Sequence, residues 1–178
     1  YKELQRYLGF ACHYRQPRRR FMAITHGLSG SGKSTVAARL VEASGAVRLR
    51  SDVERKRLFG LAPEQRSRAG DAAALSTADM TRKTFYRLAE LAEAVLEAGF
   101  PVIVDGTFLH RHVRDDFRQL AQRLNTPFAI LACVADVDDI RTRLVAREQG
   151  PVYVSEAGVE VMEQQKRQIE PPAGEELE

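Results

Sequence analysis

The stretch that most constrains the fold of this chain is GLSGSGKST, at residues 27–35. It fits the pattern G-x-x-x-x-G-K-[ST], in which glycines let backbone amides turn inward and approach phosphate oxygens. An apolar run of strand length, residues 21–25, precedes it, and apolar residues recur at helical spacing from Val36 to Val41 until Gly45. A strand, a tight loop and a helix in this order are the setting of a phosphate-binding loop. The alternative is a glycine-rich turn with an incidental lysine.

The loop supplies three kinds of group for a bound triphosphate. Lys33 is a mobile positive charge for the β- and γ-phosphates, and the Ser34 hydroxyl can enter the shell of a Mg²⁺ ion. The helix that opens near Lys33 adds its positive end. The sequence therefore predicts ATP and Mg²⁺ as ligands. We expect the nucleotide to be held by Gly27, Ser29, Gly30, Ser31, Gly32, Lys33, Ser34 and Thr35.

Strands and helices alternate along the rest of the chain. Strands are expected at residues 21–25, 47–49, 102–105 and 128–134, and helices after the loop and at 53–59, 85–98, 113–124, 137–148 and 155–169. Such alternation predicts an α/β fold with one parallel sheet of four strands and helices on both faces. The run at 128–134 is continuously apolar, which indicates a strand buried on both faces. A chain of 178 residues is long enough for one such domain.

Two aspartates lie where strands of this sheet would end. Ligands of parallel sheets bind at the carboxyl ends of the strands. Asp105 closes the strand at 102–105 and is expected to hold Mg²⁺ together with Ser34, directly or through water. Alternatively, Asp105 caps the turn that follows. Thr107 is expected to bring a hydroxyl near the γ-phosphate.

Asp52 follows the strand at 47–49 and is predicted to face an acceptor hydroxyl across from the γ-phosphate. A carboxylate in that place orients the hydroxyl and accepts its proton. Arg55, one helical turn on, is expected to grip an anionic part of the acceptor. The alternative is that Ser51 or Asp52 serves only as the N-cap of the helix.

Arg143 and Arg147 are four residues apart on the helix after the fourth strand, so they share one face. If a lid carries this helix, the two guanidinium groups can neutralise the charge that builds on a transferred phosphoryl group. Gly-Pro at residues 150–151 fits a hinge beside such a lid. The alternative is a solvated helix face that pairs with Asp138 or Asp139.

The bulk composition excludes several classes of protein. The chain is 44% hydrophobic and 29% charged, as in globular domains, and no apolar stretch approaches the ~18 residues of a membrane span. Cys12 and Cys133 stand alone, so neither a disulfide framework nor a zinc site is indicated, and a cytoplasmic location is expected. A net charge of +3 is too small by itself to indicate nucleic-acid binding.

The motifs together resemble the P-loop kinases of the polynucleotide kinase, zeta-toxin and gluconate kinase type. The resemblance covers about residues 21–168 and rests on THGLSGSGKST at 25–35, RSDVERK at 50–56 and the stretch from Ser155 through Gln165 to Pro171. In closest detail, the chain is similar to the kinase-like module that bacteria fuse behind an aminoglycoside-phosphotransferase-like domain. The resemblance implies a P-loop NTPase fold of the nucleoside-kinase type. It also implies roles in catalysis or substrate binding for Asp52, Arg55, Asp105, Thr107, Arg143 and Arg147.

The same resemblance divides the chain into three parts. Residues 1–20, with helical spacing over 2–15, would be the end of an upstream domain and its connector. Residues 21–170 would be the kinase domain, and residues 171–178 an acidic tail that we expect to be loose. Residues 61–76 are rich in small and polar types, which predicts a mobile loop. Such folds usually carry a fifth strand after the last helix, and no apolar run follows that helix here, so four strands are expected; a fifth strand that lies outside this sequence would leave a sheet edge exposed.

Two functions of different classes remain open at this point. An ATP-dependent kinase would transfer the γ-phosphate to a nucleic-acid 5′ end, a nucleotide-sugar, a sugar or an antibiotic. A regulatory nucleotide-binding or ATPase module would act on the fused upstream domain and would not need the carboxylate of Asp52. A transporter or an AAA-type motor is disfavoured, because the chain is short and shows neither a transporter signature nor a second ATPase subdomain. The expected partners are a nucleotide, a hydroxyl acceptor and the upstream domain, with nucleic acid as one acceptor; no membrane partner is expected.

Overall fold

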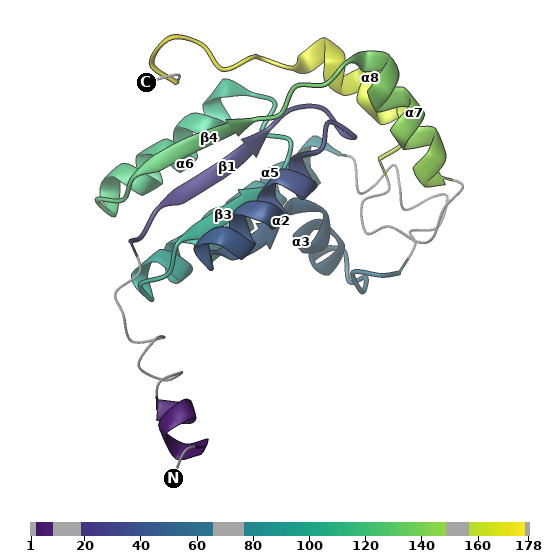
Figure 1. Cartoon of the computed structure of the whole chain (residues 1–178). Coiled ribbons are helices and arrows are strands. Elements are labelled where there is room, and N and C mark those ends of the chain that lie inside the picture. Colours follow the sequence, from purple (N-terminus) through teal and green to yellow (C-terminus); the bar gives the residue numbers. More distant parts are fainter. Residues whose placement is uncertain (1–2, 9–18, 66–76, 149–156, 177–178) are drawn as a thin grey trace.

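A computed structural model of the chain describes residues 3–8, 19–65, 77–148 and 157–176. Its centre is one sheet of parallel strands in the order β2-β3-β1-β4 (Figure 1). The strands are β1 (Met22–His26), β2 (Val47–Arg50), β3 (Val102–Asp105) and β4 (Phe128–Ala132). The predicted α/β fold with four parallel strands is therefore confirmed within the described residues.

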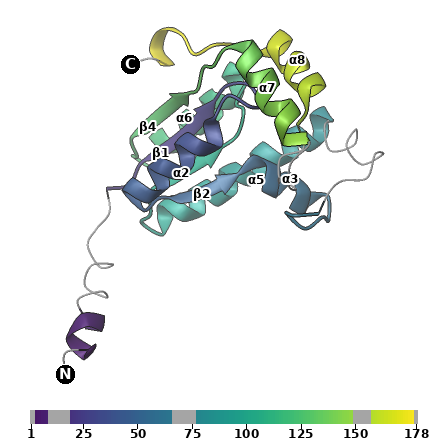
Figure 2. The same ribbon diagram turned by 45° about the vertical axis from the view of Figure 1, so that its right-hand side comes forward.

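Helices cover both faces of this sheet (Figures 1 and 2). Their bounds are α2 (Lys33–Ser44), α3 (Ser51–Leu58), α5 (Ala78–Glu97), α6 (Arg111–Arg123), α7 (Val137–Glu148) and α8 (Val159–Gln168), with a short 3-10 helix η1 (Gly174–Glu176) near the end. Residues 3–8 form a further helical segment.

The side chains of β1 alternate between two cores, as the period of a strand requires. Met22 and Ile24 pack with buried side chains of α5 and α6, whereas Ala23 packs with Ala37 of α2. Because both faces are covered, the middle of the sheet is apolar and fixes β1 and β3 rigidly. The loops that leave their carboxyl ends therefore start from well-determined positions.

Parallel register brings three of these carboxyl ends together. Arg50 at the end of β2 lies opposite Asp105 at the end of β3, and β1 is in register with β3 from Met22 to Ile24. Helices α7 and α8 lie beside each other beyond the carboxyl end of β1 (Figures 1 and 2).

Two expectations about packing are wrong. The fourth strand was expected to be buried on both faces, but β4 lies at the edge of the sheet, and Ala129 and Ala132 are exposed. An apolar run cannot distinguish a central strand from an edge strand whose outer positions are alanine.

The acidic tail was expected to be loose, yet Glu176 is buried and accepts hydrogen bonds of 2.6 and 2.9 Å from the fully buried Arg114. A guanidinium group without water needs a carboxylate partner, and the tail supplies it.

Several expectations concern residues outside the described part. These are the helix over residues 9–15, the loop over 66–76, the Gly150-Pro151 hinge and the start of the last helix at Ser155. Among the described helices, none is both long and apolar enough to cross a bilayer.

Candidate active site

The phosphate loop connects β1 to α2 and is built on glycines with positive φ. Gly27, Gly30 and Gly32 have φ of 136°, 86° and 95°. A Cβ atom at Gly27 would lie 2.4 Å from the backbone oxygen of Cys133, so only glycine fits where the loop leaves the sheet. Gly32 occupies the N-cap position of α2 without a side-chain cap, which leaves the first amides of this helix open.

The backbone amides of the loop fall into two groups. The Gly27 and Ser31 amides donate to Thr107 O and Leu28 O, both at 3.1 Å, and the Ser29 amide donates to Gln165 Oε1 at 2.8 Å. Of the five amides from Gly30 to Ser34, the other four have no hydrogen-bond partner among the described residues, namely those of Gly30, Gly32, Lys33 and Ser34. Consecutive unpaired amides at a helix start form a nest that suits an anion.

Two side chains of the loop also fit a phosphate ligand. The buried Ser31 hydroxyl has no hydrogen-bond partner within the described part of the chain. Lys33 is 8% exposed, and its Nζ donates to Leu28 O at 2.6 Å. Burial lowers the pKa of Lys33 to about 8, although the charge of Asp105 acts in the opposite direction. A phosphate group would satisfy both side chains.

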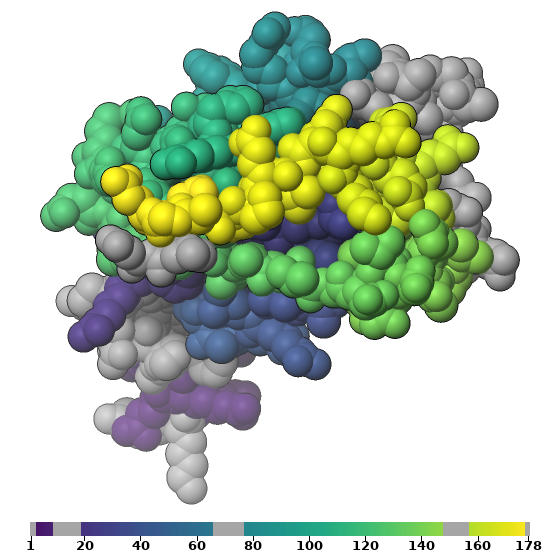
Figure 3. Space-filling model, turned by 90° about the horizontal axis from the view of Figure 1, so that it is seen from above, coloured from purple at the N-terminus to yellow at the C-terminus, as the bar shows by residue number. Residues whose placement is uncertain are grey.

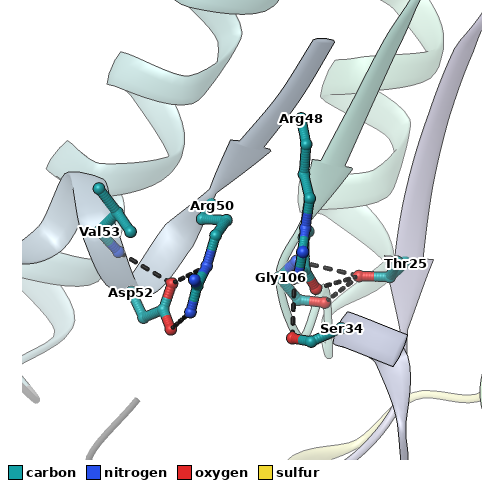
Figure 4. A network of polar contacts seen from close by, with 8 residues as sticks. Thr25, Ser34, Arg48, Arg50, Asp52, Val53 and Gly106 are labelled. Carbon is teal, nitrogen blue, oxygen red and sulfur yellow. Dashed lines mark hydrogen bonds and ion pairs between the residues drawn. The ribbon is translucent and has the colours of Figure 1, made fainter. Parts of the chain in front are cut away.

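Asp105 is bound by residues of two neighbouring strands and of the phosphate loop, namely Arg48, Thr25 and Ser34, which Figure 4 labels. Its Oδ2 accepts a hydrogen bond of 2.9 Å from Ser34 Oγ and forms an ion pair with Arg48 of β2. Thr25 of β1 holds Gly106, the residue after Asp105, because the Thr25 hydroxyl accepts a hydrogen bond of 2.9 Å from the Gly106 amide. Among the described residues, the hydrogen bonds that Asp105 accepts come from Thr25, Ser34 and Arg48, and none comes from the turn that follows it.

Asp52 lies at the start of α3, beside Arg50 (Figure 4). Arg50 donates to Asp52 Oδ1 and Oδ2 at 3.1 and 2.7 Å, and the Val53 amide donates to Oδ1 at 2.9 Å. Since a carboxylate has about four acceptor positions, one on Oδ2 is left for a further donor. The N-cap alternative is wrong, because Arg50 occupies the N-cap position of α3.

The arginines of α7 approach the loop from its other side. Arg143 Nη1 lies 3.5 Å from Gly30 O as a weak donor, and Arg143 Nη2 is 3.9 Å from Asp139. Arg147 is half-buried and donates to Ala157 O. The alternative of a solvated, paired face therefore describes Arg143 in part, whereas it does not describe Arg147.

These residues meet in one cavity of about 640 Å³ at the carboxyl ends of the strands. Of the predicted site residues, Gly27 and Arg55 are absent from its lining. Arg55 is half-buried, and burial lowers its pKa while the charge of Asp52 opposes this effect. The predicted residues that line the cavity are Ser29, Gly30, Ser31, Gly32, Lys33, Ser34, Thr35, Asp52, Asp105, Thr107, Arg143 and Arg147.

Four polar residues at the site were not predicted as site residues. Arg50 and Ser51 line the cavity, Arg48 pairs with Asp105, and Gln165 of α8 binds the loop. The sequence did contain a signal for the arginines, because Arg48 and Arg50 alternate on a strand and so share one face. His26 is buried and donates from Nδ1 to Phe108 O at 3.0 Å, as expected for a packed histidine.

One group of curated relatives matches most of this chain in sequence. The chain is 30% identical over 133 residues to uncharacterized protein Rv2004c of Mycobacterium tuberculosis (strain ATCC 25618 / H37Rv), covering 72% of this chain. It spans about a quarter (26%) of the length of that relative.

Solved structures of the same fold include a gluconokinase and a sugar kinase. A gluconokinase from Sinorhizobium meliloti 1021 has a TM-score of 0.61 at 22% identity, over 89% of this chain and 79% of its own. A sugar kinase from Janibacter sp. HTCC2649 has a TM-score of 0.61 at 19% identity, over 88% and 82%. A chain of the Pnkp1/Rnl/Hen1 RNA repair complex has a TM-score of 0.56 at 18% identity, over 89% and 49%.

A family described as "AAA domain" (AAA_33) matches residues 22–172, which include every strand and all the cavity-lining residues. The description names AAA proteins, whereas the two solved structures named above by activity are kinases. The chain therefore belongs to the AAA_33 family and has the fold of the P-loop kinases.

Proposed function

We propose that this protein is an ATP-dependent kinase that transfers the γ-phosphate of ATP to a hydroxyl acceptor. One observation carries the proposal: the phosphate loop, two strand-end carboxylates and two arginines of α7 line the same cavity. The loop alone would suit any nucleotide-binding protein. A carboxylate across the cavity from the loop suits phosphoryl transfer, because it can orient an alcohol nucleophile.

The loop side of the cavity would hold the nucleotide. The four unpaired amides and the Lys33 ammonium group would bind the β- and γ-phosphates. Ser34 Oγ and the Asp105 carboxylate are the oxygens that would hold Mg²⁺. When bound, Mg²⁺ supplies positive charge to the phosphate oxygens.

The acceptor would enter on the side of Asp52. Its hydroxyl would donate to the remaining position on Asp52 Oδ2, while Arg50 keeps the carboxylate in place. The acceptor oxygen then attacks the γ-phosphorus, the bond to the bridging oxygen breaks, ADP leaves and the hydroxyl proton passes to Asp52. Arg143 and Arg147 would neutralise the charge on the transferred group, and Thr107 would contact the γ-phosphate.

The class of acceptor follows less directly. The gluconokinase and the sugar kinase suggest a sugar or sugar acid, whereas the RNA repair complex suggests a nucleic-acid end. A cavity of about 640 Å³ lies within the range of small-molecule sites. Arg55 would contact an anionic part of the acceptor only if α3 or the acceptor brings the two together, since Arg55 does not line the cavity.

The test uses labelled ATP and Mg²⁺ with a panel of acceptors: sugars and sugar acids, a nucleotide-sugar, an aminoglycoside, and DNA and RNA oligonucleotides with 5′-hydroxyl ends. We expect transfer to one class, and Asp52→Asn to lower its rate by about 10²- to 10⁴-fold with nucleotide affinity retained. Asp116→Asn, at an exposed position of α6, is the matched control. Undiminished transfer by Asp52→Asn would remove the assignment of the base.

The regulatory alternative is weaker on the same observation. A module that only binds nucleotide has no need of a second carboxylate, that of Asp52, in the cavity of its phosphate loop. Release of phosphate to water alone, unaffected by any acceptor, would favour that alternative. The fused upstream domain, the division of the chain at residues 20 and 170, and the cytoplasmic location stay predictions.

A further inference from the structure

Helices α7 and α8 form a small core of their own that includes the phosphate loop. Ile140 and Leu144 of α7 are buried against Met162 of α8, and Leu28 of the loop packs against this cluster. The cluster is separate from the two cores that cover the sheet. The hairpin of α7 and α8 is therefore attached to the rest of the domain partly through the loop itself.

The approach of α7 to the loop is close. A Cβ atom added to Gly30 would lie 3.1 Å from both the Ile140 and the Leu144 side chain. The Gly30 amide is also one of the four unpaired amides of the nest. Gly30 thus contributes its backbone amide to the phosphate site, while its Cα lies against α7.

Helix α8 adds a polar contact. Gln165 Oε1 accepts a hydrogen bond of 2.8 Å from the Ser29 amide, directly before the unpaired amide of Gly30. Because Gln165 occupies only the Ser29 amide, its bond is compatible with a phosphate in the nest. In Figure 3 purple-blue atoms from the early part of the chain are visible between the light-green α7 and the yellow segment that contains α8.

The two helices are tied to each other as well. Arg141 of α7 forms an ion pair of 2.7 Å with Glu163 of α8, and Arg147 donates to Ala157 O, just before α8. A change in the position of α8 would therefore move the arginines of α7 as well as the phosphate loop.

We infer that Gln165 is a positioning residue of the phosphate site, which couples the α7–α8 hairpin to nucleotide binding through the Ser29 amide. The inference rests on the proposed function for the role of the arginines. Gln165 holds Ser29, the residue before the unpaired amide of Gly30. It thereby keeps α8, and with it Arg143 and Arg147 of α7, in position for the transferred phosphoryl group. By linkage, nucleotide in the nest stabilises the seated hairpin, and the seated hairpin raises nucleotide affinity by the same factor.

The test compares two isosteric substitutions in the full chain. Gln165→Met keeps the length of the side chain and removes the acceptor oxygen, whereas Gln164→Met makes the same change at the neighbouring exposed position. We expect Gln165→Met to weaken binding of a fluorescent ATP analogue by about 3- to 10-fold, the effect of one hydrogen bond, with a further loss in kcat. We expect Gln164→Met to behave as wild type in both measurements.

Hydrogen exchange of the peptide at 157–168 gives a second readout that a merely structural role would not move. Nucleotide should slow exchange in α8 of the wild type and of Gln164→Met, and should do so much less in Gln165→Met. Equal nucleotide affinity in all three proteins, or an α8 whose exchange ignores nucleotide, would overturn the inference.

The two proposals fail in different ways. A wild type that binds ATP but transfers phosphate to no acceptor removes the proposed function, while the binding and exchange measurements still decide the role of Gln165. A wild type that binds no nucleotide overturns both.

Discussion

The two carboxylates of the cavity are held by contacts of different range. Asp105 has a side chain 5% exposed and is bound by Ser34 and Arg48, which are 71 and 57 residues away in the sequence. Asp52 has a side chain 24% exposed and is bound by Arg50 and Val53, which lie within two residues of it. The side of Asp105 is therefore part of the fold, whereas the side of Asp52 is a local feature of one strand end.

This difference suggests that the two sides of the cavity serve different ligands. A site held by distant parts of the chain cannot change without disturbing the sheet, so it suits the ligand common to all P-loop proteins, the triphosphate. A site held by a few adjacent residues can change while the fold persists, so it suits the acceptor, which differs from one kinase to another. The predictions below test whether the two sides can be separated.

The largest effect is expected from Lys33→Ala. Lys33 is the buried cation of the loop, and its loss removes a charged hydrogen-bond donor from the triphosphate. We expect ATP affinity to fall about 100-fold and phosphate transfer to be lost. Titration of a fluorescent ATP analogue measures the change.

Lys83→Ala is the control for that substitution, because Lys83 is an exposed lysine of α5 that pairs only with Asp79 among the described residues. Wild-type affinity in Lys33→Ala would mean that the buried side does not bind the nucleotide, and the comparison would lose its basis.

The two arginines of β2 provide a matched pair for stability. Replacing Arg48 removes the cation that pairs with the nearly buried carboxylate of Asp105. Replacing Arg50 removes the cation that pairs with the more exposed carboxylate of Asp52. We expect Arg48→Met to lower the free energy of unfolding by about 2–3 kcal/mol. We expect Arg50→Met to lower it by less than about 1 kcal/mol. Urea denaturation of both variants measures the difference, and equal losses would contradict the contrast between the two sides.

How much of this contrast the sequence could predict depends on the range of the contacts. The phosphate loop, the strand before it and the helix after it form one continuous segment, so the sequence could predict them. The convergence of Ser34, Asp52 and Asp105 could also be predicted, because parallel strands end at the same edge of the sheet. Their presence in one cavity agrees with that reasoning. The catalytic roles themselves remain predictions that the substitutions must test.

The contacts that escaped prediction depend on strand order and on how distant segments dock. Arg48 contacts Asp105 because β2 lies next to β3, and the sequence of β2 does not indicate which strand it pairs with. Gln165 reaches Ser29 only because α8 folds back over the loop. Edge placement of β4 and the burial of Glu176 against Arg114 have the same origin, since each is decided by what packs nearby.

The last expected effect is absent at neutral pH and appears only above about pH 8: a pH dependence of ATP affinity that should belong to the nucleotide side alone. The pKa of Lys33 is about 8, lowered mainly by burial. Below pH 8 the ammonium group is already charged, so ATP affinity should be flat. Above pH 8 binding must first take up a proton, so affinity should fall by up to about tenfold per pH unit until the higher pKa of the complex is reached.

Stability should change in the opposite direction over the same range. Because the folded-state pKa of Lys33 lies below its ordinary value of 10.5, the unfolded chain binds more protons between about pH 8 and 10.5. The contribution of Lys33 to stability therefore rises with pH there, while nucleotide affinity falls. Lys33→Arg keeps its charge and should show neither trend, whereas Asp52→Asn should keep the wild-type pH profile of ATP binding. A profile that shifts with Asp52→Asn would show that the two sides of the cavity titrate as one, and their separation would fail.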